Sequence, residues 1–271
     1  MTKSYGINKV VSAERYSEKI LEEFYSIGYA IVENVVSPDE LQLLRSELDR
    51  IYKIQAESFG PENLKKINEE YMARALLCYS EPYLNLARNA TIMEYVERIM
   101  GKYFLLHLQN GIINMPGREH HQSSWHRDFP YQNWVSSEPI GCNAFYCIDE
   151  FNKETGSTFL LPFSHKMPHM LSASYLEKHA IQVEAKAGSV LLFDSMLFHK
   201  AGYNSSPNIR RGVNHLYARA MVRQQINLPE MLKGKYATDP FLNMLLGYDA
   251  QSSLSVDDFR NRRLIKNQKS Y

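Results

Sequence analysis

Residues 188–199 of the chain, GSVLLFDSMLFH, combine a glycine turn, an apolar run of strand length and a histidine at its end. A polar residue rarely closes such a run unless it is paired or ligated. A turn-rich connection, residues 200–209, leads from His199 into a further apolar segment that begins at Arg210. The pattern predicts two neighbouring β-strands that bring a histidine and an arginine side by side, with Arg211 on the opposite face.

The triplet His126-Arg127-Asp128 lies far upstream of His199. Alternate residues of a strand point to the same side, so His126 and Asp128 are expected to aim at one point. Two histidines and one carboxylate form the facial triad of non-haem Fe(II) oxygenases, which leaves open positions on the metal. A His-x-Asp triplet alone also occurs by chance on exposed strand edges. Together with His199, it predicts an Fe(II) site whose open positions take a co-substrate and O₂.

The remaining pattern divides the chain into three parts of one domain. Residues 1–103 are expected to hold the N-terminal helices and first strands, with a charged flap at 56–82. Residues 104–224 form short apolar runs broken by glycine, proline and asparagine, which is typical of an all-β barrel or sandwich. Residues 225–271 are predicted to be a C-terminal helical tail.

Five features of the sequence together form one further pattern. They are residues 24–41, which predict a helix, a strand and a second helix; His126-Arg127-Asp128; residues 156–165, GSTFLLPFSH; His199; and Arg210. This pattern resembles the phytanoyl-CoA dioxygenase family, whose members are Fe(II)- and 2-oxoglutarate-dependent oxygenases. The resemblance runs over most of the chain. It departs from the family at Phe163 and Lys200, where glycine is common, and Phe163 bears on the shape of the site entrance.

The resemblance implies a mainly β fold with flanking helices around a double-stranded β-helix, a jelly-roll or cupin-like core. It implies that His126, Asp128 and His199 bind Fe(II) and that Arg210 holds 2-oxoglutarate. Asn114 would lie near 2-oxoglutarate, or else make an ordinary strand-end turn. Phe145 would line the 2-oxoglutarate pocket, or else serve as a core aromatic.

Substrate contacts are expected from loops that flank the triplet, because loops on a rigid scaffold commonly carry them. The candidates are Arg118, His121, Phe129 and Trp134, with Arg74 from the flap. The alternative is a polar loop at the mouth of the site. His165 is expected to fix a turn rather than to bind metal, since three ligands suffice.

The composition fits such an enzyme. The 271 residues include 31 Lys+Arg and 30 Asp+Glu, so no global field attracts nucleic acid or a membrane surface. No apolar stretch approaches the roughly 20 residues that span a bilayer, and the N-terminus lacks the apolar part of a signal peptide. The three cysteines are irregularly spaced, which favours reduced thiols and a cytoplasmic location. The expected partner is a small-molecule substrate, and the sequence does not indicate the oligomeric state.

The expected reaction is hydroxylation, or another oxidation, of an unactivated C–H bond, with succinate and CO₂ as co-products. Related halogenating enzymes replace the carboxylate ligand by a small residue, so Asp128 favours hydroxylation or a desaturating or ring-forming variant. Two alternatives are a cupin-type metalloenzyme and a catalytically inactive β-barrel binding protein. Cupins usually use more histidines and do not need Arg210, and the complete set of four residues argues against an inactive barrel.

Overall fold

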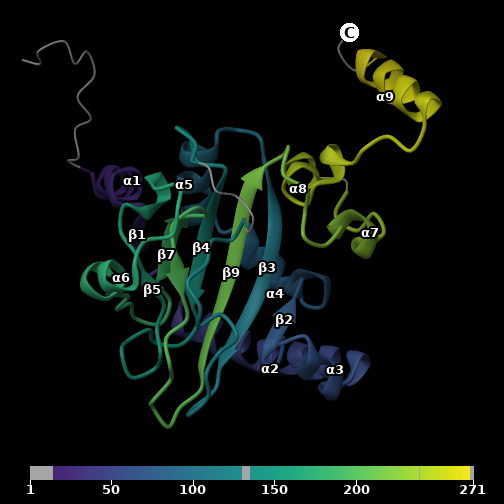
Figure 1. Ribbon diagram of the computed structural model, residues 1–271. Coiled ribbons are helices and arrows are strands. Elements are labelled where there is room, and N and C mark those ends of the chain that lie inside the picture. The colour runs from purple at the N-terminus through teal and green to yellow at the C-terminus, as the bar shows by residue number, and fades with distance from the viewer. Residues whose placement is uncertain (1–14, 130–134, 238, 269–271) are drawn as a thin grey trace, which may run out of the picture.

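The computed structural model describes residues 15–129, 135–237 and 239–268, with side chains described up to residue 265. Two antiparallel sheets form the centre of the molecule (Figure 1). The large sheet has the strand order β1-β7-β4-β9-β3-β2, and the small sheet has the order β6-β5-β8. Because strands distant in sequence are neighbours, the sheets bring widely separated segments to one place.

The strands are β1 (Tyr29–Val32), β2 (Met72–Arg74), β3 (Phe104–Asn114), β4 (Gly141–Cys147), β5 (Phe159–Leu160), β6 (Ile181–Gln182), β7 (Val190–Asp194), β8 (His199–Lys200) and β9 (Arg210–Arg219). The helices are α1 (Tyr16–Ile27), α2 (Pro38–Phe59), α3 (Pro61–Lys66), α4 (Glu81–Ala87), α5 (Ala90–Met100), α6 (Ala173–His179), α7 (Leu228–Leu232), α8 (Pro240–Leu245) and α9 (Val256–Gln268). Three short 3-10 helices lie at Leu76–Cys78, Ser164–Lys166 and Tyr248–Ala250.

The start of α2 shows how local sequence fixes an element. The Ser37 hydroxyl accepts a hydrogen bond from the Glu40 amide, and the Glu40 carboxylate accepts one from the Ser37 amide at 3.0 Å. This reciprocal cap satisfies amides that the first helical turn leaves without partners. The buried side of α2 then rests on β3 at Gly111, where a Cβ atom would lie 2.2 Å from the Leu48 Cδ1 atom. Glycine at this position therefore lets the helix approach the sheet.

The two faces of the large sheet have different partners. On β4, Ala144 and Tyr146 belong to the main core, which also contains the buried sides of α1, α2, α4 and α5. The alternate residues Phe145 and Cys147 belong to a second core that includes Leu160 of the small sheet. A helical layer thus covers one face, and the small sheet covers the other. The site described below lies between the two sheets.

The predicted fold class is confirmed, with two antiparallel sheets flanked by helices. Two local predictions are wrong. His126 forms only an isolated bridge with His199, and Asp128 lies in a bend, so the two residues do not share a strand. Residues 56–82 are not an irregular flap, because they contain the end of α2, α3, β2 and the fully buried Leu76. The division of the chain at residues 104 and 225 stays a prediction.

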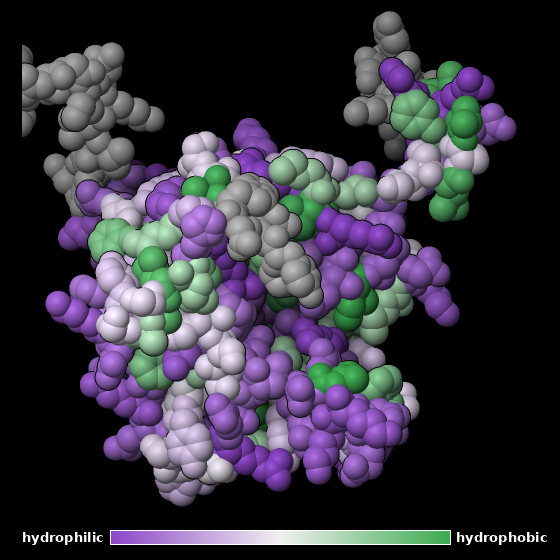
Figure 2. Space-filling model, viewed as in Figure 1, coloured by the Kyte–Doolittle hydropathy of each residue, from purple (hydrophilic) through white to green (hydrophobic). Residues whose placement is uncertain are grey.

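The C-terminal part of the chain has two kinds of packing. Leu228 of α7 and Leu245 of α8 belong to the main core. Helix α9 instead lies apart from the sheets, with exposed apolar side chains such as Phe259 and Leu264 (Figures 1 and 2). Elsewhere on the face in Figure 2, hydrophilic side chains predominate and apolar ones are scattered. Within the described part of the chain, no helix combines the length and the apolar character needed to cross a membrane.

Candidate metal and 2-oxoglutarate site

His126, Asp128 and His199 converge between the two sheets. One possible ligand atom from each of the three side chains lies within 4.8 Å of the others. The His126 amide donates to the His199 carbonyl and the His199 amide donates to the His126 carbonyl, both at 3.0 Å. This backbone bridge places the imidazole centroids 4.3 Å apart. The pairing of a loop with β8, rather than alternation within one strand, brings the histidines together.

Both imidazoles use one ring nitrogen for the backbone and present the other to the site. His126 Nδ1 lies 2.8 Å from the Ser124 carbonyl, and His199 Nδ1 lies 2.9 Å from the Leu197 carbonyl. A carbonyl accepts, so each Nδ1 carries the proton and each Nε2 keeps a lone pair. Burial lowers the pKa of His199 to about 4, which favours the neutral imidazole that binds metals.

Asp128 completes the group from a bend that is tied to the end of β7. Its amide donates to the Ser195 carbonyl at 3.2 Å. Its Oδ2 atom accepts from Asn143 Nδ2 at 2.6 Å, and its Oδ1 atom lies 3.7 Å from His199 Nε2. The carboxylate therefore offers one oxygen to a metal while the other is held by β4.

Arg210 is a buried cation at the start of β9. It is 1% exposed, and its Nη2 donates to the Gly156 carbonyl at 2.9 Å. Its Nε and Nη1 find no hydrogen-bond partner among the residues that the structure describes. Burial lowers its pKa to about 10, so the guanidinium remains charged at neutral pH. A buried charge without a full set of partners is costly, and a carboxylate would supply the missing acceptors.

The triad and Arg210 share one cavity. Its lining also includes the apolar rings of Phe145 and Phe193 and the side-chain amides of Asn110, Gln122 and Asn214. Two imidazole nitrogens and one carboxylate oxygen match the ligand set of Fe(II), and the orphaned Arg210 donors match a dicarboxylate anchored at its far end. The residues present therefore fit Fe(II) and 2-oxoglutarate.

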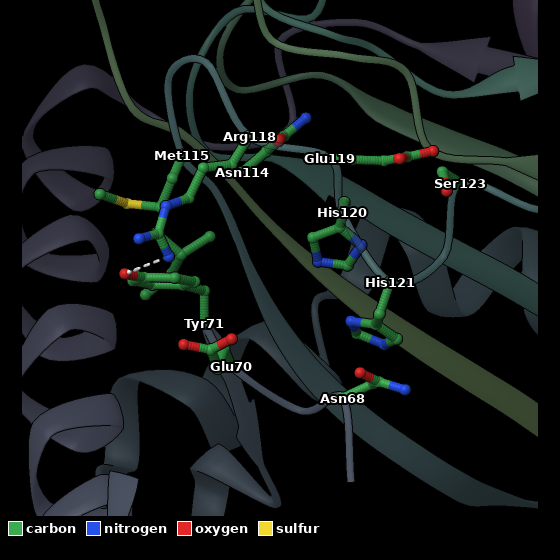
Figure 3. Close-up of a pocket in the computed structure, with 11 residues that line it drawn as sticks. Asn68, Glu70, Tyr71, Asn114, Met115, Arg118, Glu119, His120, His121 and Ser123 are labelled. Carbon is green, nitrogen blue, oxygen red and sulfur yellow. Dashed lines mark hydrogen bonds between the residues drawn. The ribbon is translucent and has the colours of Figure 1, made fainter. Parts of the chain in front are cut away.

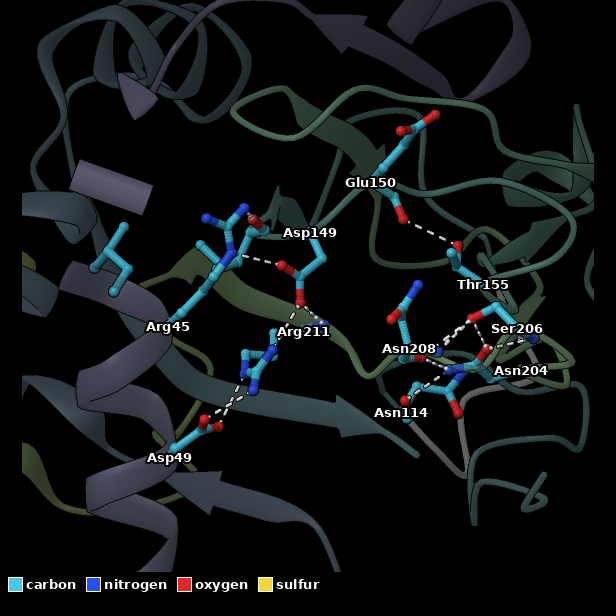
Figure 4. Close-up of polar contacts among 12 residues, drawn as sticks. Arg45, Asp49, Asn114, Asp149, Glu150, Thr155, Asn204, Ser206, Asn208 and Arg211 are labelled. Atoms are coloured by element: carbon cyan, nitrogen blue, oxygen red, sulfur yellow. Dashed lines mark hydrogen bonds and ion pairs between the residues drawn. The ribbon is translucent and has the colours of Figure 1, made fainter. Parts of the chain in front are cut away.

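The two remaining candidates for 2-oxoglutarate binding differ in position. Phe145 lines the cavity and packs edge-on against Phe151, with ring centroids 5.2 Å apart. Asn114 lies opposite Arg210 in the sheet but uses its amide to bind the Gly156 and Gly202 carbonyls at 3.1 and 3.0 Å. Its own carbonyl accepts from Asn204 (Figure 4). Asn114 thus holds the loops around Arg210 and does not line the triad cavity.

The substrate candidates do not form one group. Arg118 and His121 line an outer cleft of about 360 Å³, where Arg118 donates to the Tyr71 hydroxyl at 3.1 Å (Figure 3). Phe129 is buried in a small apolar cluster with Leu108 and Ile140. Arg74 forms an ion pair with Glu69. Trp134 lies outside the described residues.

Other residues of the site were missed in the sequence. Asn143 and Asn214 are buried, and Asn214 lines the cavity. Ser195 is fully buried beside Asp128. An asparagine inside the apolar runs GCNAFYC and GVNHLYA was the available signal, because a buried polar side chain requires a partner.

Comparison with known proteins agrees with this geometry. The model of the phytanoyl-CoA dioxygenase (PhyH) family matches residues 24–212. An uncharacterized protein of Mycobacterium tuberculosis is 28% identical over 89% of this chain and 90% of its own. The ectoine dioxygenase of Nocardia farcinica is 24% identical over 76% of this chain and 79% of its own. The epimerase SnoN, solved with Fe³⁺, α-ketoglutarate and nogalamycin RO, superposes with a TM-score of 0.59 at 16% identity, over 79% of this chain and 88% of its own.

The chain belongs to the phytanoyl-CoA dioxygenase family. It is a 2-oxoglutarate-dependent dioxygenase, and iron and 2-oxoglutarate are its metal and co-substrate. The predicted family, enzyme class and cofactors are confirmed, so the cupin-type and inactive alternatives are set aside.

Proposed function

We propose that this enzyme hydroxylates an unactivated C–H bond of a small molecule. The observation that carries the proposal is the convergence of His126, Asp128, His199 and Arg210 on one buried cavity. Fe(II) with 2-oxoglutarate and O₂ supplies the oxidising power, and succinate and CO₂ are the co-products. Asp128 supports hydroxylation over halogenation, because its carboxylate takes the position that a halide would need.

Different residues of the site bind the metal, bind 2-oxoglutarate and exclude water. The two Nε2 atoms and the Asp128 Oδ1 atom hold the metal. Arg210 would bind the distal carboxylate of 2-oxoglutarate through its orphaned donors, and its Cζ atom lies 4.4 Å from the centroid of the Phe151 ring. The rings of Phe145 and Phe193 line the cavity and exclude water from the reacting centre.

We propose that the substrate enters through the outer cleft. A second hollow of about 300 Å³ shares Glu119, His120 and Ser123 with this cleft and shares Lys200 and Ala201 with the triad cavity. The three spaces are therefore neighbours, which supports entry of the substrate along this series. Arg118 and Glu70 give the outer cleft charges of both signs, which supports a small polar substrate.

The test is turnover of a compound library with Fe(II), 2-oxoglutarate and ¹⁸O₂. Succinate is expected to form with an active compound, and its product should gain one labelled oxygen atom. His199→Ala is the inactive control. A halogenated product, a desaturated product or an epimer without oxygen gain would refute hydroxylation. Failure of the wild-type protein to bind 2-oxoglutarate in the presence of Fe(II) would refute the site assignment.

The cytoplasmic location is also proposed from the cysteines. Cys142 and Cys147 are buried, and neither is paired in a disulfide within the described residues. Burial raises the pKa of Cys147 to about 12, so this thiol is protonated and unreactive at neutral pH.

A further inference from the structure

Two asparagines extend inward from Asp128 as a chain of hydrogen bonds. Asn143 Nδ2 donates to Asp128 Oδ2 at 2.6 Å, and Asn214 Nδ2 donates to Asn143 Oδ1 at 2.8 Å. Asn143 is 0% exposed and Asn214 is 8% exposed. The two residues lie on the adjacent strands β4 and β9, where Asn214 pairs with Phe145 and therefore lies diagonally to Asn143. Bulk solvent cannot replace this contact.

The direction of every amide in the chain follows from the carboxylate. A metal-binding carboxylate is ionised and only accepts, so Asn143 must turn its NH₂ group toward Asp128. Asn143 then presents its oxygen to Asn214, which must donate in turn. Asn214 Oδ1 is left as a buried acceptor with no partner among the described residues, and Asn214 lines the triad cavity. One ionised group thus orders two amides and leaves an acceptor at the end of the chain.

We propose that Asn143, itself oriented by Asn214, is the positioning residue that holds Asp128 as a single-oxygen metal ligand. The inference rests on the proposed function of the same site. Asn143 occupies Oδ2, so Oδ1, the oxygen nearer to His199 Nε2, is the one presented to the metal. Without this hydrogen bond, the carboxylate can rotate and bind through both oxygens or turn away. Partners that orient a metal ligand in this way commonly contribute 10–100-fold to metal affinity.

The experiment titrates the apo-protein with Co(II), a visible stand-in for Fe(II), and compares three leucine substitutions. Asn143→Leu removes the contact with Asp128 at similar volume and is expected to weaken Co(II) binding roughly 10–100-fold. Asn214→Leu keeps the contact between Asn143 and Asp128 but removes the partner that orients the Asn143 amide. Co(II) affinity should therefore fall only roughly threefold, less than in Asn143→Leu. Circular dichroism of each variant checks that it is folded.

Asn110→Leu is the matched control. Asn110 lines the same cavity and lies directly opposite Asn214 on β3, yet its side chain makes no hydrogen bond to another described residue. The control should bind Co(II) like the wild type. The visible absorption of bound Co(II), which reports its coordination, should change in Asn143→Leu and not in Asn110→Leu.

Two results would overturn the inference. One is wild-type affinity and spectrum in Asn143→Leu. The other is an equal loss in Asn110→Leu, which would assign the effect to cavity packing. If Asn143→Leu does not fold, Asn214→Leu is the deciding variant. Wild-type Co(II) affinity in Asn214→Leu would then contradict the proposed role of the two asparagines. A wild-type protein that binds no Co(II) would instead contradict the proposed function, so the two failures are distinguishable.

Discussion

Arg210 and Arg211 are neighbours on β9, yet their side chains serve opposite faces of the sheet. Arg210 points into the triad cavity with two donor atoms that no described residue satisfies. Arg211 points toward α2, where it binds Asp49 at 2.8 and 2.9 Å and Asp149 at 3.2 Å (Figure 4). Asp149 is in turn held by Arg45 at 2.6 Å. An arginine thus has unsatisfied hydrogen-bond donors on one face of the sheet, and its neighbour is held in ion pairs on the other face.

The difference separates groups that bind a ligand from groups that hold the fold. A single orphaned group is weak evidence, because both ring nitrogens of the buried His165 also have no partner within the described structure. Several unpaired polar groups around one cavity are stronger evidence for a ligand site. The triad cavity is lined by three residues with such groups, namely His126 with its Nε2, Arg210 with its free donors and Asn214 with its Oδ1. Four substitutions test this distinction.

The largest effect is expected from His199→Ala. The variant loses one of three metal ligands and should retain no iron after dialysis, with no 2-oxoglutarate turnover. Metal analysis and succinate release are the measurements. His165→Ala is the matched control, since His165 is also a buried histidine whose ring nitrogens have no partner among the described residues, but it lies outside the triad cavity. Iron retention in the first variant, or equal loss in both, would contradict the distinction.

Arg210→Ala should act on the co-substrate and leave the metal in place. Losing a buried pair with a carboxylate costs on the order of 2–5 kcal/mol, or roughly 30-fold to several thousand-fold in the KM for 2-oxoglutarate. Iron content should stay near that of the wild type. Arg210→Lys keeps the positive charge but not the two parallel donors of the guanidinium. Its KM for 2-oxoglutarate should therefore lie between that of the wild type and that of Arg210→Ala. An unchanged KM in Arg210→Ala would remove the proposed role of this residue.

His215, also on β9, is a fully paired polar group and predicts a pH effect. Gln109 Nε2 lies 2.8 Å from its Nε2, and the Tyr217 hydroxyl lies 3.2 Å from its Nδ1. Gln109 turns its oxygen to the Leu77 amide and so offers only a donor, which leaves no acceptor for a second proton on His215. Burial lowers the pKa of His215 from 6.5 to about 3.

The unfolded chain therefore binds this proton while the folded chain does not, between about pH 6.5 and 3. Folding stability rises with pH in that window and is lost as the pH falls through it. One such histidine accounts for about 1.4 kcal/mol between pH 7.5 and 5.5. Urea unfolding at both pH values should show a smaller decrease for His215→Phe than for the wild type. Parallel decreases would show that His215 is protonated in the folded protein.

The sequence predicted the parts of the site that are local or chemically distinctive. The His-x-Asp triplet, His199 at the end of an apolar run and Arg210 at the start of the next strand were all visible, and Arg211 faces away from the cavity as the alternation predicted. The Asn143–Asn214 contact could not be predicted, because it depends on how β4 and β9 align.

Two substrate candidates, which stay predictions, show a related limit of the sequence. The sequence shows that Phe129 and Arg74 lie near functional segments, but not which way they turn. Phe129 turns toward Leu108 and Ile140, and Arg74 turns toward Glu69. Proximity in the sequence indicated which segment lies near the site, but it did not indicate the direction of each side chain.

The smallest effect is expected from Arg211→Ala, the outward counterpart of Arg210→Ala. The variant loses two ion pairs, but Asp49 is 47% exposed and water screens much of the interaction, so about 1 kcal/mol of folding stability should be lost. Asp149 keeps its contact with Arg45, which limits the loss further. The KM for 2-oxoglutarate should change less than about twofold, because Arg211 lies on the face away from the cavity. Urea unfolding and steady-state kinetics on the same preparation give both quantities. A raised KM with unchanged stability would mean that the two arginines have exchanged roles and that the register of β9 is shifted by one residue.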